Sequence, residues 1–386
     1  MNNFTYCNPT RIVFGKDTIA QLKELLPKEA RVLMTYGGGS IKRNGVYEQV
    51  RSALAGHALL EFGGIQPNPL YETLMDAVAL GRKEKVTYLL AVGGGSVLDG
   101  TKFIAAAIPF ATGQDPWDIL AKNAPVPTNA LPVGSVLTLP ATGSETNTFA
   151  VISRRSTGEK LAFGNELMVP RLAILDPQTT LSLPAKQTRN GIVDAFVHVM
   201  EQYATYPVHA PLQDRFAESI LQTLIEEGPQ LLAKPQDYDL RASIMWCATQ
   251  ALSGLIGCGV PQDWATHMIG HEITAFYGLD HAETLAIVLP TLLAHQKSAK
   301  SAKLLQFARR VWHVTTPHEA TAIDEGISAT RRFFESLSMP TTLVAYRVNA
   351  AEAAGKIRDR FTMRGTKLGE RGTITPDEVA LIVQKC

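Results

Sequence analysis

The chain has 386 residues, 45% of them hydrophobic, and its 37 Lys and Arg residues nearly balance its 36 Asp and Glu residues, which gives a formal net charge of +1. This length is sufficient for two domains with substantial hydrophobic cores. The balanced charge argues against nucleic acid as a partner and against a disordered chain, so we expect the partner to be a small molecule.

The cysteines and the apolar segments indicate the cellular compartment of the protein. Cys7, Cys247, Cys258 and Cys386 form no C-x-x-C pair, and a chain of this size does not need disulfides to fold, which favours a reducing compartment. No uninterrupted apolar run reaches the roughly 20 residues that cross a bilayer, and the N-terminal residues do not read as a signal peptide. We therefore expect a cytoplasmic protein with no membrane partner.

Strand-like and helix-like segments alternate through the first 180 residues. Short apolar runs rich in β-branched residues predict strands at residues 11–15, 31–37, 58–64, 88–94, 135–140 and 172–177. Helical periodicity between them predicts a parallel sheet covered by helices on both faces. Residues 151–164 interrupt this pattern with two short runs around Ser156-Thr157-Gly158, which indicates a β-hairpin. We predict an α/β domain at residues 1–180.

The pattern changes after residue 180. Long segments with helical periodicity and few β-branched runs fill residues 181–386, which predicts an all-α second domain with those bounds. Residues 114–132 contain four prolines and are predicted to form an ordered surface excursion of the first domain.

Two glycine turns share one local design. Gly37, Gly38, Gly39 and Ser40 follow one predicted strand, Gly93, Gly94, Gly95 and Ser96 follow another, and each turn opens a predicted helix. Glycines let the backbone approach a phosphate, and a helix N-terminus favours negative charge. Ser96 and Asp99 also match a helix-capping arrangement, which is an ordinary structural use of such residues. Because parallel sheets bind ligands at this edge, two such turns favour a phosphate-bearing ligand.

The first turn also bears on which dinucleotide could bind. Neither turn has the G-x-G-x-x-G spacing, but a related sheet can bind the same cofactors. An acidic residue at the end of the second strand would bind a ribose hydroxyl and repel a 2′-phosphate. Here the strand is followed by glycines, Ser40, Lys42 and Arg43, a sequence compatible with NADPH.

Candidate metal ligands lie in the helical half. Asp194 and His198 are four residues apart, as are His267 and His271, and His281 follows. Residues with this spacing share one face of a helix. A lone histidine is more often part of the core, but burying several unpaired ionisable groups would be costly. A carboxylate with two or three imidazoles is typical of a divalent metal site with one open position.

Two other classes of protein fit less well. The pair His267 and His271 resembles the two helical histidines of a zinc protease, but that motif needs Glu directly after the first histidine, where this sequence has Met268. A non-catalytic metal or nucleotide sensor would need a partner surface, and the sequence offers no basic patch or disordered tail to provide one.

Several motifs occur together and in order: PTRIVFGK, QPNP, LLAVGGGSVLDGTK, LTLPATGSETN, LDPQTTLSLP with GIVDAFVHVMEQ, and GHEITAFYGLDHAET. In these the chain resembles the iron-containing (group III) alcohol dehydrogenase family, and most closely its bacterial NADPH-dependent broad-range aldehyde reductases and butanol dehydrogenases. The resemblance implies a Rossmann-like dinucleotide-binding domain, an all-α domain of the dehydroquinate synthase-like fold, an active site in the cleft between them, and a homodimer.

The resemblance also implies site residues. The metal ligands would be Asp194, His198, His267 and His281, whereas His271 would lie outside the ligand set and relay a proton or orient substrate. The first glycine turn would receive the 2′-phosphate and the second, with Asp99, the pyrophosphate and ribose. The remaining cofactor-binding residues would be Asn68, Thr138, Thr142 and Lys160.

The function implied is NADPH-dependent reduction of aldehydes to primary alcohols, reversible as an alcohol dehydrogenase. A divalent metal would polarise the carbonyl during hydride transfer. Three imidazoles and one carboxylate suit iron or zinc, and nickel or manganese are also compatible. The alternative is a metal- and NAD-dependent lyase or synthase of the dehydroquinate synthase type, in which the cofactor is oxidised only transiently.

Overall fold

The computed structural model describes all 386 residues, and the chain forms two compact units. The α/β unit comprises Cys7–Pro184 and Pro235–Thr249, and the helical unit comprises Met1–Tyr6, Ala185–Lys234 and Gln250–Cys386. The main change from one unit to the other therefore follows Pro184. A single division of the chain at residue 180 would not capture the two exchanged segments, Met1–Tyr6 and Pro235–Thr249.

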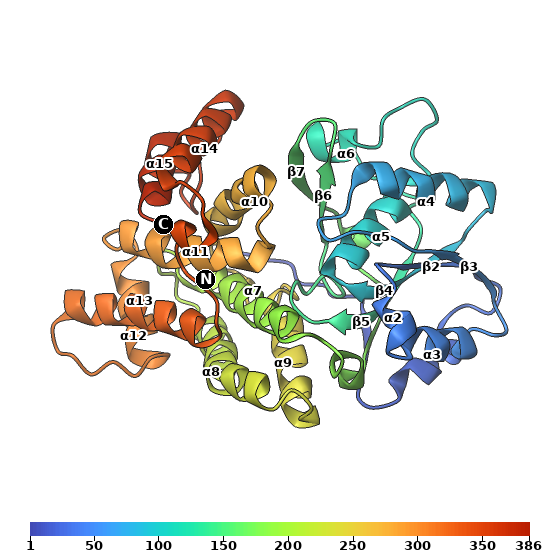
Figure 1. Cartoon of the computed structure of the whole chain (residues 1–386), viewed down its shortest axis with the longest axis horizontal. Coiled ribbons are helices and arrows are strands. Elements are labelled where there is room, and N and C mark those ends of the chain that lie inside the picture. The colour runs from blue at the N-terminus through green and yellow to red at the C-terminus, as the bar shows by residue number, and fades with distance from the viewer. The chain divides into compact units, whose positions relative to one another are not determined.

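The α/β unit is built on a six-stranded parallel sheet with the order β1-β8-β5-β4-β2-β3 (Figure 1). The strand order reverses between β2 and β4. From β2 the next strand, β3, is added on one side of the sheet, whereas β4, β5 and β8 are added on the other side. Both the predicted strands and their parallel arrangement are confirmed. The strands are β1 (Arg11–Phe14), β2 (Arg31–Tyr36), β3 (Ala58–Phe62), β4 (Tyr88–Gly94), β5 (Val133–Leu139) and β8 (Leu172–Leu175).

Alternating side chains of the strands fill two cores, one on each face of the sheet. In β4, Leu89 and Ala91 belong to one core and Leu90 and Val92 to the other, as the two-residue period of a strand requires. Helices α4 and α5 cover one face, and α2 and α3 the other (Figure 1). The helices of this unit are η1 (Thr18–Gln21), α1 (Leu22–Leu25), α2 (Ser40–Arg43), α3 (Val46–Ala53), α4 (Tyr71–Lys83), α5 (Gly95–Ala107), α6 (Asp118–Ala121), η2 (Glu166–Met168), η3 (Pro177–Thr180) and α9 (Tyr238–Ala251), whose last two residues belong to the helical unit.

The predicted hairpin is present as an antiparallel pair, β6 (Phe149–Arg154) and β7 (Glu159–Gly164). It is attached to the segment before α4, where Ser153 N donates to Pro69 O at 2.9 Å. Within the Gln114–Pro132 excursion, only Asp118–Ala121 forms a helix, the single turn α6.

The helical unit contains no strand and is organised around α11 (His281–His295), which packs against α7, α10, α13 and α15. Every residue of α11 from Ala282 to Leu293 is buried, so this helix forms the centre of the unit's core. The other helices are α7 (Ala185–Tyr203), α8 (Pro211–Ala233), α10 (Ala265–Tyr277), α12 (Ser301–Arg310), α13 (Glu319–Ser336), η4 (Leu343–Tyr346), α14 (Ala350–Arg364) and α15 (Pro376–Gln384).

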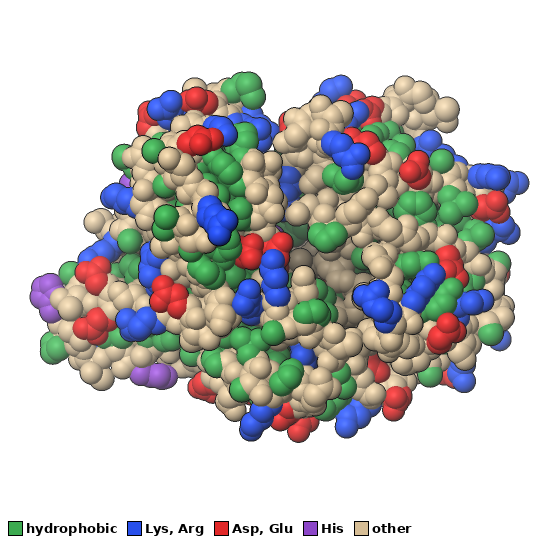
Figure 2. All heavy atoms as spheres, viewed as in Figure 1, with side chains coloured by type: hydrophobic (Ala, Val, Ile, Leu, Met, Phe, Trp, Pro, Cys, Tyr) green, Lys and Arg blue, Asp and Glu red, His purple; other side chains and the backbone are tan.

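Neither unit has a helix that combines the length and the apolar character needed to cross a membrane. On the face drawn in Figure 2, Lys and Arg side chains are interspersed with Asp and Glu side chains rather than gathered into one patch. This distribution is in keeping with the formal net charge of +1.

Candidate functional site

One face of α7 carries three ionisable side chains in the core of the helical unit. Asp194, His198 and Glu201 follow one another at intervals of four and three residues, so they lie on the same side of the helix. All three are buried. Burying such groups together would be costly without partners, and the partners come from α10 and from the first residue of α11.

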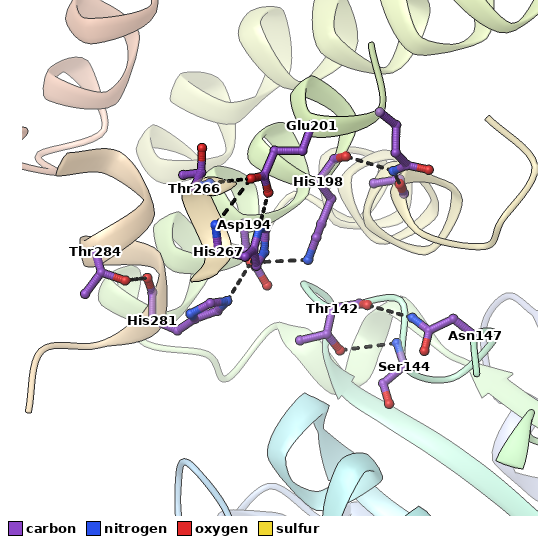
Figure 3. A network of polar contacts seen from close by, with 12 residues as sticks. Thr142, Ser144, Asn147, Asp194, His198, Glu201, Thr266, His267, His281 and Thr284 are labelled. Carbon is purple, nitrogen blue, oxygen red and sulfur yellow. Dashed lines mark hydrogen bonds and ion pairs between the residues drawn. The ribbon is translucent and has the colours of Figure 1, made fainter. Parts of the chain in front are cut away.

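Three imidazoles converge on one carboxylate oxygen (Figure 3). The Nε2 atoms of His198, His267 and His281 lie 3.7, 3.9 and 3.7 Å from Asp194 Oδ1. Ligand atoms of Asp194, His267 and His281 all lie within 4.8 Å of one another. His198 is not part of that triplet, but its ring stacks on that of His267 with centroids 4.7 Å apart. The structure thus brings together all four residues expected as ligands.

Glu201 fixes the orientation of His267. Its carboxylate binds Nδ1 of the His267 ring and accepts hydrogen bonds from the backbone N–H groups of Thr266 at 2.7 Å and His267 at 3.3 Å. These are among the first N–H groups of α10, which have no acceptor within the helix. With Nδ1 bound to Glu201, Nε2 of His267 is directed toward Asp194 (Figure 3). This carboxylate–histidine pairing is typical of metal-binding histidines.

These residues fit a divalent metal ion. The Nε2 atom of His267 is buried and has no hydrogen-bond partner, which is the state of an atom available for coordination. A tetrahedral site with bonds of about 2.1 Å places its ligand atoms about 3.4 Å apart, close to the 3.7–3.9 Å between Asp194 Oδ1 and the three Nε2 atoms. Burial opposes protonation of His267, but Glu201 and Asp194 outweigh it and raise the pKa of His267 to about 9. The site therefore favours positive charge.

His271 lies beside this cluster without joining it. Its ring centroid is 5.2 Å from that of His281 and 6.3 Å from that of His267, and the residue is buried. This position is compatible with a residue that lies beside the metal ligands without being a ligand itself.

In the α/β unit, the two glycine turns follow neighbouring strands. Tyr36 of β2 pairs with Val92 of β4, so Gly37–Ser40 and Gly93–Ser96 leave the sheet at the same edge. This edge is also where the strand order reverses, and open α/β sheets bind ligands at such a point. Both turns open a helix, but α2 has four residues whereas α5 has 13.

The second turn contacts β5 and the loop that follows β5. The pairing of β4 with β5 passes from Gly93–Leu137 to Gly94–Leu139 and skips Thr138. A Cβ atom at Gly95 would lie 2.5 Å from Thr142 Cγ2. Thr138 and Thr142, both predicted to bind cofactor, are therefore adjacent to the second glycine turn.

Asp99 and Lys102 on α5 hold the segment between Thr142 and Val151 from inside the unit. Asp99 accepts hydrogen bonds from Ser144 Oγ at 2.7 Å and Val151 N at 2.9 Å. The buried Lys102 Nζ donates to Asn147 O at 2.9 Å, Asn147 Oδ1 at 3.2 Å and Phe149 O at 2.8 Å. Burial lowers the pKa of Lys102 to about 8, against the opposing effects of Asp99 and Glu145. Both side chains thus have partners within the protein.

The remaining predicted cofactor residues lie on connections and on the hairpin. Asn68 is in the segment between β3 and α4 and has a left-handed backbone with φ of 53°. Lys160 lies on β7 opposite Ser153 of β6. Burial raises the pKa of Asp99, and the charge of Lys160 is among the effects that oppose this rise, so these two groups interact electrostatically.

Sequence reasoning did not identify Glu201 or Lys102. Glu201 could have been found, because it lies seven residues after Asp194 and so belongs to the same helix face. Lys102 has no such signal. Its function depends on backbone carbonyls of Asn147 and Phe149, about 45 residues away in the chain, and the sequence does not show where those carbonyls point.

Comparison with known proteins gives matches along nearly the whole chain. The model described as iron-containing alcohol dehydrogenase matches residues 9–177, and that described as Fe-containing alcohol dehydrogenase family, C-terminal, matches residues 188–384. The chain is 58% identical over 377 residues to NADPH-dependent aldehyde reductase YqhD of Escherichia coli K12, covering 98% of this chain and 97% of the relative. It is 41% identical to probable NADH-dependent butanol dehydrogenase 1 of Bacillus subtilis, covering 100% and 99%.

A solved structure shows the same fold. The crystal structure of E. coli K-12 YqhD superposes with a TM-score of 0.98 at 57% identity, and the match covers 100% of this chain and 98% of that one.

Proposed function

Because this chain belongs to the iron-containing alcohol dehydrogenase family, we propose that it catalyses the reversible, NADPH-dependent reduction of aldehydes to primary alcohols. The observation that carries the proposal is the convergence of three imidazole Nε2 atoms on Asp194 Oδ1 in the helical unit. The names of the two relatives, an NADPH-dependent aldehyde reductase and a probable butanol dehydrogenase, agree in reaction class.

The metal centre would be held by Asp194, His198, His267 and His281. A divalent metal bound there supplies Lewis acidity beside a carbonyl oxygen. With a divalent metal bound, the three imidazoles would be neutral and the one carboxylate ionised, and this ligand set would leave the centre with a net positive charge. His271, adjacent to His281, would deliver a proton to the product oxygen or orient the substrate.

The glycine turns would bind the cofactor, which supplies the hydride. Backbone N–H groups of the second turn and the start of α5 would bind the pyrophosphate. The first turn would bind the 2′-phosphate, because a side chain at Gly38 or Gly39 would meet no atom within 4 Å and Lys42 and Arg43 follow in α2. We assign Asp99 a positioning role as well, since its carboxylate holds Ser144 and Val151.

The assay is NADPH consumption at 340 nm with a panel of short aldehydes, together with metal analysis of protein purified without added metal. His267→Ala is expected to lower metal affinity and turnover together by at least about a hundredfold, while circular dichroism shows a folded chain. His209→Ala removes an exposed imidazole of the same unit and is expected to change neither.

Two results would contradict the proposal. Full reductase activity in the His267→Ala variant would refute the ligand assignment. Transient oxidation of cofactor without net consumption would instead favour a lyase or synthase of the dehydroquinate synthase type.

We further propose that the enzyme is a homodimer that works in the cytoplasm. All four cysteines are free, which agrees with a reducing compartment. Sedimentation equilibrium would test the subunit number, and a molar mass of one chain would contradict the dimer.

A further inference from the structure

The ligand-bearing face of α7 extends beyond the metal centre toward the start of the helix. Lys186 and Asn190 precede Asp194 by eight and four residues, so they lie on the same face, about one turn apart. At the other end of this face, Glu201 binds the first N–H groups of α10. The residues at the two ends therefore lie where they can fix neighbouring helices.

Both upstream residues bind one carboxylate oxygen of Asp280. Asn190 Nδ2 donates to Asp280 Oδ2 at 3.1 Å, and Lys186 Nζ lies 2.9 Å from the same oxygen. Lys186 Nζ also lies 3.3 Å from Glu283 Oε1. Two side chains of α7 thus reach the two acidic residues that flank His281.

Asp280 and Glu283 form the capping box that begins α11. The Asp280 side chain accepts from the backbone N–H of Glu283, and Glu283 Oε2 accepts from Asp280 N at 3.0 Å. His281, the first residue of α11, lies directly after the cap, and its carbonyl accepts from Thr284 Oγ1 at 2.7 Å. A capping box fixes the direction in which a helix begins, and here it also fixes the backbone of His281.

We propose that Lys186 and Asn190 are positioning residues of the metal centre, which hold Asp280 and thereby place His281 Nε2 against Asp194 Oδ1. This inference rests on the proposed function, because it takes His281 and Asp194 as ligands. In this arrangement α7 contributes two ligands directly, sets His267 through Glu201, and sets His281 through Asp280.

The side chains of the Lys186–Asp280 ion pair are exposed, so an effect on the position of His281 can be distinguished from an effect on folding stability. The side chains of Lys186 and Asp280 are 48% and 39% exposed, and exposed ion pairs contribute little to folding stability. Losing the Lys186–Asp280 ion pair is therefore expected to leave the unfolding temperature nearly unchanged. Metal affinity is more sensitive, because it depends on where each ligand atom lies, and loss of outer partners of ligands typically lowers it about 10- to 100-fold.

The test is a double-mutant cycle on the full-length chain, freed of metal and titrated with Zn²⁺ against a chromophoric chelator. Asn190→Ala and Lys186→Met are each made in the natural chain and in a His281→Ala chain. Lys297→Met serves as the matched control, since it breaks a 2.6 Å ion pair with Asp324 elsewhere in the same unit. The Co²⁺ absorption spectrum of each variant reports ligand geometry separately from affinity.

We expect each substitution to weaken Zn²⁺ binding about tenfold in the natural chain and less than about twofold in the His281→Ala chain, because the effect passes through His281. The control should change neither affinity nor spectrum. Equal losses in both backgrounds, or no loss in the natural chain, would overturn the positioning role alone. Unchanged Zn²⁺ affinity in His281→Ala itself would overturn the ligand assignment, and the positioning role with it.

Discussion

The two glycine turns have the same four residues, yet glycine serves a different purpose in each. In the second turn it makes space, and none of its glycines has a positive φ. Cβ atoms there would lie 2.5–2.8 Å from neighbouring side chains, namely Gly93 against Val97, Gly94 against Leu139 and Gly95 against Thr142. Real Cβ atoms do not approach so closely, so these positions exclude any side chain.

In the first turn the space is open at Gly38 and Gly39 but not at Gly37, where a Cβ atom would lie 3.2 Å from Ile65 O. A Cβ atom at Gly38 or Gly39 would meet nothing within 4 Å, and only Gly39, with φ of 87°, has a backbone that favours glycine. The same tetrapeptide therefore forms a closed turn over α5 and an open turn before α2. The open turn has room for side chains at Gly38 and Gly39, whereas the closed turn presents only its backbone.

The largest effect is expected from a substitution that disrupts the closed turn. Gly95→Ala would bring Cβ to 2.5 Å from Thr142 Cγ2 and 2.7 Å from Thr142 Oγ1. Overpacking of this kind costs about 1–3 kcal/mol, so we expect NADPH affinity to fall by up to about a hundredfold and the unfolding temperature to fall as well. Fluorescence titration and thermal denaturation measure the two effects. Gly38→Ala is the matched change in the open turn, and its thermal stability should stay within about 0.5 kcal/mol of the natural chain; equal destabilisation would refute the comparison.

A smaller effect is expected from a charge in the open turn. Gly39→Asp would place a carboxylate where we propose the 2′-phosphate binds, so the ratio of kcat/KM with NADPH to that with NADH should fall about tenfold or more. Gly39→Asn imposes the same backbone strain without the charge and should leave the ratio nearly unchanged. If the two variants behave alike, the 2′-phosphate does not bind at this turn.

The smallest expected effect, when taken per pH unit, concerns the buried network behind the closed turn. The pKa of Lys102 is lowered from 10.5 to about 8 in the folded chain, so between these pH values the unfolded chain binds more protons. The free energy of unfolding should therefore rise with pH in this window, by at most about 1.4 kcal/mol per pH unit. Urea denaturation across the window should show the rise in the natural chain and in Lys297→Met, and its loss in Lys102→Met. A rise of the same size in Lys102→Met would assign it to other groups.

Much of this architecture follows from local patterns in the sequence. The apolar runs predict the strands because a strand buried on both faces needs apolar side chains on both. The spacing of Asp194 and His198 predicts that they share one helix face. In the structure, His267 of α10 and His281 of α11 lie close to Asp194 on that face. The family resemblance supplied the ligand set, which periodicity alone left open among five residues.

The sequence does not predict which residues far apart in the chain contact one another. Asp99 is predicted to bind the cofactor, and the sequence does not show that its oxygens also accept hydrogen bonds from Ser144 and Val151, which follow it by 45 and 52 residues. The assignment of Pro235–Thr249 to the α/β unit also has no local signal, because α9 has ordinary helical periodicity. Which core a helix joins depends on the packing of distant residues.

The exchanged segments have a consequence for how the chain is made. It passes between its units after Tyr6, Pro184, Lys234 and Thr249. Domains generally fold in order as the ribosome releases them, but here the α/β unit lacks α9 until residue 249 has emerged. The helical unit in turn includes Met1–Tyr6, which are synthesised before the α/β unit, and Asn2 N donates to Gly259 O at 2.8 Å. These six residues therefore lack this native contact until residue 259 has been synthesised, and neither unit can be produced as one uninterrupted fragment.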